Sequence, residues 1–275
     1  MKSPNRTSAA NSLTNRLKPN LAVVAAFAVA AMSAFSPSLQ KAGAQTTQTP
    51  WQNLTQSQLS AVWWEFSLSV PVSISPWFDD TGAKAANGQP YFSAPGGAGN
   101  LLFLVGTVNV SGTVTRSISV KQGTALFFPV LNNEWDNVLG TPHLGGTIPA
   151  GPVYGVPELR AIAAGPIDSA TGLYSSVTPT DKSFKKATGA TISLDYPRLL
   201  SPPFSYTLPA TDNLYQYFGV NVSGTVGPAV SDGYWSFIPG TGANSLAPGY
   251  YVLQFGGSQG NGFTEAITYH ITVTP

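Results

Sequence analysis

Two segments, residues 246–255 and 263–273, constrain the fold of this chain more than any other feature. The first contains a Pro-Gly turn at 248–249 and alternates after it, and the second alternates through Ile267, Tyr269 and Ile271. A period of two indicates β-strands that bury one face. Two such strands in succession are typical of the closing strands of immunoglobulin-like or jelly-roll sandwiches, so the sequence predicts an all-β, antiparallel β-sandwich.

Earlier parts of the chain carry further strand patterns. Four strands separated by short turns are expected between residues 101 and 130, with Ser111 and Gly112 forming a hairpin turn, and this favours an antiparallel sheet. Three more strands are expected at residues 204–208, 215–222 and 233–238. The 28 Gly and 23 Pro residues disfavour long helices and favour many turns.

Two helices are predicted. Thr55 and Gln58 fit a capping box, and an apolar stripe at helical spacing follows until Pro71, so we expect an N-terminal helix that packs on a sheet. A short middle helix is expected over residues 157–164, with a proline at its start and Gly165 just past its end. Residues 168–190 are predicted to be a loop, and the lysines within it a solvated turn.

One heptapeptide occurs twice. Residues 108–114 and 220–226 both read Val-Asn-Val-Ser-Gly-Thr-Val. Two sheets that each contain a copy of a similar hairpin would explain the repeat. Local convergence on a favourable hairpin sequence is the alternative.

The start of the sequence resembles a secretory signal peptide. A basic leader precedes a fifteen-residue run at 21–35 that is apolar except for Ser33, and the small-x-small motif Ala42-Gly43-Ala44 follows. The apolar run is shorter than the roughly 20 residues that a membrane-spanning helix needs. We therefore expect a signal peptide at 1–44, a polar tether at 45–52 and one β-sandwich domain at 53–275, with a secreted or periplasmic product that is not membrane-inserted after cleavage.

Charge and cysteine content narrow the function classes. Beyond residue 44 the chain carries eight Lys and Arg against twelve Asp and Glu, a net charge of −4. A mildly acidic chain lacks the basic footprint of nucleic-acid-binding proteins. The chain contains no cysteine, which excludes a lipoprotein anchor, a thiol nucleophile and thiolate metal sites.

Three stretches carry a partial resemblance to a protein family. Residues 63–79 with Trp63-Trp64, residues 123–130 reading Gly-Thr-Ala-Leu-Phe-Phe-Pro-Val, and residues 268–273 reading Thr-Tyr-His-Ile-Thr-Val are similar to a family of exported bacterial proteins of unknown function. The resemblance covers most of the chain beyond the leader. It implies export but no activity and no catalytic residue, and the cysteine pair common in that family is missing here.

The densest cluster of polar and aromatic residues follows the strand expected to end at Val130. Sugars are bound by an aromatic ring flanked by amides and carboxylates, and binding residues usually lie on loops at the end of a rigid sheet. The predicted ligand-binding residues, placed on such a loop, are Asn132, Asn133, Glu134, Trp135, Asp136 and Asn137. A long loop with turn-capping Asn and Asp residues and a buried Trp135 is the alternative.

Two weaker candidates concern metals. Residues 79–82, with Asp79 and Asp80, can bind Ca²⁺ or form a type I turn, and the turn is favoured because the EF-hand pattern is absent. His143 and His270 are the two histidines, and nothing in the sequence brings them together. We therefore predict no metal site and no cofactor.

These observations predict an exported protein that binds glycan or another extracellular polymer without catalysis. A polysaccharide-active hydrolase or lyase that uses Asp79, Asp80, Glu134 and Asp136 is the first alternative. A structural protein of the cell envelope is the second. Polysaccharide is the expected partner, and nucleic acid is not.

Overall fold

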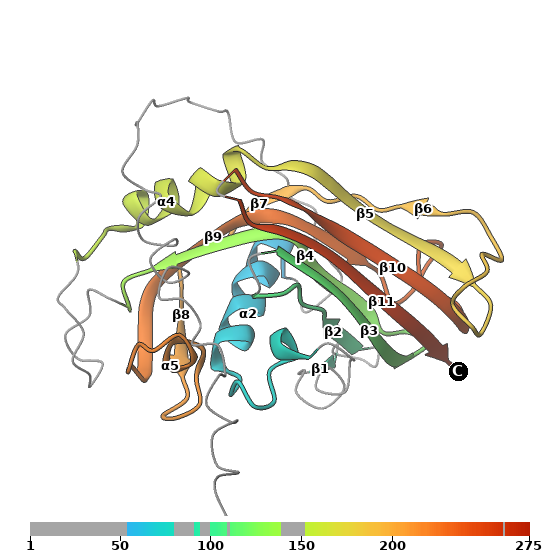
Figure 1. Cartoon of the computed structure of the whole chain (residues 1–275), viewed down its shortest axis with the longest axis horizontal. Coiled ribbons are helices and arrows are strands. Elements are labelled where there is room, and N and C mark those ends of the chain that lie inside the picture. Colours follow the sequence, from blue (N-terminus) through green and yellow to red (C-terminus); the bar gives the residue numbers. More distant parts are fainter. Residues whose placement is uncertain (1–53, 80–90, 94–99, 109–110, 139–151, 261) are drawn as a thin grey trace, which may run out of the picture.

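The computed structural model describes residues 54–79, 91–93, 100–108, 111–138, 152–260 and 262–275 (Figure 1). The signal peptide and tether predicted for residues 1–52 lie outside the described residues, as do Asp80 and His143. None of the described helices has the length and apolar character needed to cross a bilayer.

Two β-sheets dominate the described part of the chain. The six-stranded sheet has the order β1-β2-β4-β9-β7, with β8 also paired to β9. Its strands are β1 (Tyr91–Ser93), β2 (Asn100–Phe103), β4 (Ala125–Asp136), β7 (Arg198–Leu200), β8 (Phe204–Leu208) and β9 (Gly224–Ile238). The five-stranded sheet has the order β3-β11-β10-β5-β6. Its strands are β3 (Ser111–Lys121), β5 (Thr171–Thr180), β6 (Ile192–Ser193), β10 (Gly249–Ser258) and β11 (Thr264–Thr274).

Both sheets are mixed, whereas the sequence predicted antiparallel pairing. β2 pairs in parallel with β4, and β3 pairs in parallel with β11. The predicted hairpin at Ser111 and Gly112 is wrong, because these residues begin the single long strand β3. β3 and β4 follow one another in the chain but lie in different sheets, so the short turn after β3 connects the two layers.

A hydrophobic core fills the space between the two sheets. It contains side chains from β4 on one side and from β3, β10 and β11 on the other, among them Leu126, Phe128, Phe255 and Tyr269. Phe128 and Phe255 approach with ring centroids 4.7 Å apart. Burial of these large apolar side chains is the main favourable contribution to the packing of one sheet on the other.

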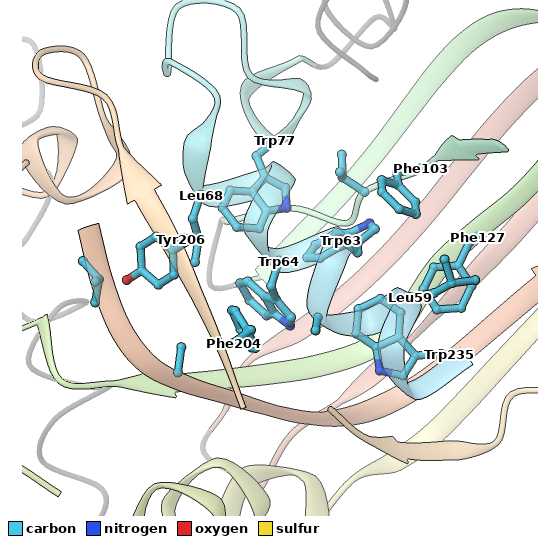
Figure 2. Close-up of a cluster of buried hydrophobic side chains, with 14 of the residues drawn as sticks. Leu59, Trp63, Trp64, Leu68, Trp77, Phe103, Phe127, Phe204, Tyr206 and Trp235 are labelled. Carbon is cyan, nitrogen blue, oxygen red and sulfur yellow. The ribbon is translucent and has the colours of Figure 1, made fainter. Parts of the chain in front are cut away.

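Helix α2 (Gln56–Ser69) covers the opposite face of the six-stranded sheet (Figure 2). Its predicted capping box is present, since the Thr55 and Gln58 side chains each accept from the other's backbone N–H. Trp63 is 1 % exposed and makes edge-on ring contacts with Trp64, Trp77 and Trp235. Its indole N–H donates to the Leu104 carbonyl oxygen at 2.8 Å, which satisfies the one polar atom of the ring.

The middle helix is longer than predicted. α4 (Val156–Asp168) passes through Gly165 and Pro166 before it ends. Ile167, beyond the expected stop, is buried, so tertiary packing extends the helix past two residues that usually end one. α4 packs on β4 and β9, and the chain continues from α4 into β5 (Figure 1).

Two further predictions fail in the middle of the chain. Residues 171–180, predicted as loop, form β5, which pairs with β10. Residues 215–222, predicted as strand, include the short helix α5 (Leu214–Tyr217), which has its own capping box between Asn213 and Gln216. The two heptapeptide copies lead into strands of different sheets, β3 and β9.

Candidate functional site

The predicted binding residues lie mostly within a strand rather than on a loop. β4 continues to Asp136, and its last five residues pair with β9 in the register Asn132↔Gly233 to Asp136↔Ala229. A register shift between Pro129 and Leu131 marks a bulge just before this stretch. The strand therefore places the side chains of the cluster alternately on its two faces.

Three members of the cluster contact the segment that contains α4. The Asn133 amide donates to the Ala163 carbonyl oxygen at 3.0 Å. The Asn137 amide donates to the Tyr154 carbonyl oxygen at 2.9 Å and accepts from the Tyr154 N–H at 2.8 Å. Trp135 packs against the cluster formed by Leu159, Ala163 and Val230. These three side chains hold α4 on the sheet, and Trp135 does not project from a loop tip.

Glu134 and Asp136 lie together on the other face, beside two tyrosines. The Tyr206 hydroxyl, on β8, donates to Asp136 Oδ2, and the Tyr215 hydroxyl, on α5, donates to the same oxygen at 2.9 Å. The two phenol oxygens are 3.3 Å apart. The Val138 N–H donates to Asp136 Oδ1 at 2.7 Å. Asp136 therefore accepts from a side chain of β8, a side chain of α5 and the backbone just after β4.

The two carboxyl groups titrate as a pair. Burial raises the pKa of Glu134 well above its usual range, and the neighbouring Asp136 charge and hydrogen bond raise it further. Burial also raises the pKa of Asp136, but the hydrogen bonds from Tyr206, Val138 and Tyr215 oppose that shift. Of the two, Glu134 therefore holds a proton more strongly than Asp136.

Both tyrosines remain protonated donors. Burial raises the pKa of Tyr206 and of Tyr215 well above 10, and the Asp136 charge acts in the same direction. A buried phenol next to an anion gives up its proton less readily because a second charge would be created in a dry environment. The site thus combines two carboxyl groups that hold protons unequally with two phenol donors.

Three buried polar atoms next to this pair have no hydrogen-bond partner among the described residues. They are Asn132 Nδ2, Glu134 Oε1 and Ser231 Oγ. Ser231 lies directly across from Glu134 in the β4–β9 register, so the three side chains share one face at adjacent positions. Buried polar atoms are normally satisfied by protein, ordered water or ligand, so this part of the sheet can bind a polar molecule. Glu134, Asp136 and Tyr215 each remain partly exposed.

The sequence did not identify three members of this group. Tyr206 alternates with polar residues in a predicted strand, whereas Tyr215 lies in the helix α5 where the sequence predicts a strand. Ser231 carries no distinguishing local signal. A buried tyrosine in a predicted strand is a weak indication of a hydrogen-bonding role, because its hydroxyl requires a partner.

The other predicted site residues lie elsewhere. Asp79 is buried, and its backbone carbonyl oxygen accepts from Arg116 Nε at 2.5 Å. His270 stacks in parallel on Phe184 with ring centroids 4.6 Å apart. Among the residues that the structure describes, no group of three or more His, Cys, Asp or Glu side chains could hold a metal ion.

Comparison with known proteins adds no relative from which a function could be transferred. The resemblance to exported bacterial proteins stays a prediction. No protein-family model matches the chain, and no curated protein or solved structure is significantly similar to it.

Proposed function

We propose that this protein is exported, in secreted or periplasmic form, and binds a neutral glycan without catalysis. The site is the group of side chains defined above, Asn132, Glu134, Asp136, Tyr206, Tyr215 and Ser231, hereafter the carboxyl–tyrosine cluster. We also propose a sandwich of jelly-roll type. The passage of the chain from one sheet to the other between β2 and β3, and back between β3 and β4, supports this topology.

One observation carries the functional proposal. Asn132 Nδ2, Glu134 Oε1 and Ser231 Oγ are a donor, a carboxyl oxygen and a hydroxyl, and all three are buried and unpartnered. A sugar presents vicinal hydroxyl groups that both donate and accept, so it can satisfy such a mixed set. The partly exposed Asp136 and Tyr215 continue the polar surface towards solvent.

Acid–base cleavage of a polysaccharide is the second candidate. The unequal proton affinities of Glu134 and Asp136 support it, because an acid and a base of separated pKa values are what such chemistry requires. The short separation between the Glu134 and Asp136 carboxyl groups favours binding over cleavage. Glycosidases place their carboxyl groups roughly 5–10 Å apart across the bond, whereas Glu134 and Asp136 share a hydrogen bond.

Ser231→Ala tests the proposed site. The Ser231 hydroxyl has no partner among the described residues, so its removal leaves folding unchanged or slightly stabilised, and weakens glycan binding by about 1 kcal/mol or more. Thr207→Ala, at an exposed position of β8, is the matched control with unchanged binding. Retention on insoluble neutral glycans and release of reducing ends are measured together for each protein.

The outcomes separate the alternatives. Loss of retention in Ser231→Ala with no reducing ends released by any variant supports a binding protein. Reducing-end release that falls about 100-fold or more in Glu134→Gln supports the enzyme, because the substitution removes the acid. Failure of the unmodified protein to retain or cleave any glycan would leave the structural envelope protein as the remaining candidate.

A further inference from the structure

The outer face of the five-stranded sheet carries rows of polar side chains. In one row, Thr115 of β3, Thr268 of β11, Gln254 of β10 and Ser176 of β5 are consecutive partners in the strand register. All four are partly or fully exposed, while Tyr269, next to Thr268 on β11, is buried in the core. Neighbouring strands are about 4.8 Å apart, so the row presents a closely spaced series of hydrogen-bonding groups.

The loop between β5 and β6 folds back over this face. Phe184, at its tip, adopts a left-handed backbone conformation with φ 59°. Its ring stacks on His270 of β11 with an interplanar angle of 2° and also contacts Tyr250 of β10. Asp181 Oδ1 accepts from the Ser183 hydroxyl at 2.6 Å and from the Ser183 N–H at 3.1 Å. The loop is therefore fixed against the sheet, at the same end as the carboxyl terminus (Figure 1).

This fixed loop gives the face a positive charge. Lys182, Lys185 and Lys186 are exposed around Phe184, and Asp181 is the one acidic side chain of the loop. The strands β3, β5, β10 and β11 contribute a single acidic side chain, Glu265, which is buried. The chain beyond residue 44 has a net charge of −4, so three of its eight basic side chains are concentrated on a face that is poor in carboxylates.

We infer that this lysine-flanked face binds an acidic polysaccharide. The three lysines pair with carboxylate or sulfate groups, and the rows of hydroxyl and amide groups bond to sugar hydroxyls. An anionic lipid surface is a poorer match, because the aromatic ring nearest the lysines is stacked on His270 and does not project. The inference is independent of the carboxyl–tyrosine cluster, which lies on the far side of the other sheet.

The experiment measures retention of the full chain on polygalacturonate gel, on cellulose and on vesicles of phosphatidylserine and phosphatidylcholine. The triple variant Lys182→Gln, Lys185→Gln, Lys186→Gln should lose at least about tenfold in affinity for polygalacturonate at low ionic strength. The triple Lys→Arg variant keeps the charge and should bind within about twofold of the unmodified protein. Circular dichroism checks that each variant folds.

The results decide the inference in either direction. Salt-sensitive retention on polygalacturonate that the Gln variant loses and the Arg variant keeps supports it. Equal retention of the Gln variant, or retention on vesicles with none on polygalacturonate, overturns it. Ser231→Ala should leave polygalacturonate retention unchanged, so failure of the proposed neutral-glycan site is distinguishable from failure here.

Discussion

Arg116 lies over the ring of Tyr269, with its guanidinium carbon 5.4 Å from the ring centroid and its Nη1 3.1 Å from the phenol oxygen. The same guanidinium donates to the carbonyl oxygens of Asp79, Val105 and Gly106, at 2.5, 2.8 and 2.9 Å. Arg116 is 0 % exposed. One buried side chain of β3 thereby connects β11 to the chain segments that follow β2 and η2 (Pro76–Phe78).

Replacement of this arginine should be strongly destabilising. Arg116→Leu removes the guanidinium donors to three carbonyl oxygens and to the Tyr269 phenol, although Tyr269 and the Val105 backbone still bond to each other. We expect a loss of about 3–5 kcal/mol in the free energy of unfolding. Tyr269→Phe, which removes a single hydroxyl, should cost about 1–2 kcal/mol. Urea titration of both variants measures whether Arg116→Leu loses more stability than Tyr269→Phe, and equal losses would contradict this prediction.

Stability should fall as the pH rises from about 4.5 to 8. Burial raises the pKa of Glu265 to about 8, although the Thr107 N–H and the Arg116 charge act in the opposite direction. The folded state thus holds a proton that the unfolded chain releases near pH 4.5, so this contribution is complete below that pH and lost as the pH approaches 8. The slope from one such group is at most about 1.4 kcal/mol per pH unit.

Glu265→Gln is the control for this dependence. It keeps the size of the side chain and removes its titration, so urea midpoints should vary less between pH 4.5 and 8. Glu134 contributes in the same direction, because its pKa is also raised by burial, and some slope should remain. A pH dependence identical to that of the unmodified protein would show that Glu265 does not titrate in this range.

Trp63 should be the most costly side chain of α2 to remove. Trp63→Ala leaves a cavity between Trp64, Trp77 and Trp235 and frees the Leu104 carbonyl oxygen, so we expect a loss of about 3–5 kcal/mol. Trp63→Phe retains a ring and should lose less. Denaturant titration measures both, and a loss below about 1 kcal/mol for Trp63→Ala would mean that α2 does not pack as described.

Trp135→Ala should destabilise the fold rather than affect a ligand directly. Trp135 packs on Leu159 and Ala163 of α4, so removal of its ring should cost about 2–4 kcal/mol. Trp135→Phe is the milder comparison. Thermal unfolding checks stability, and retention on glycan is measured well below the transition. If a Trp135 variant keeps its stability but is no longer retained on glycan, Trp135 contacts the sugar directly.

The elements that the sequence predicts well are those with local signals. α2 has a capping box and an apolar stripe within fifteen residues, and β10 and β11 alternate cleanly. β5 was missed because its burial is irregular and its pairing with β10, some 75 residues later, stabilises it. The extension of β4 to Asp136 likewise depends on β9, which no local pattern around Asn132 reveals.

The candidate site shows the same limit. The sequence singles out Glu134 and Asp136 by their position after an apolar strand, but not their partners. Tyr206 and Tyr215 are 70 and 79 residues from Asp136 in the chain. Alternation along β4 also places Trp135 on the opposite face from the two carboxyl groups. This separation can be predicted only if β4 is known to extend to Asp136.

The parallel pairing of β3 with β11 has a consequence for the order of folding. β11 lies between β3 and β10, in register with β3 over eleven positions and with β10 over ten. Until β11 has been synthesised, β3 therefore has no strand through which it can join β10 and the rest of the five-stranded sheet. For an exported chain, as we propose this one to be, late closure would keep the five-stranded sheet open until the last strand is available.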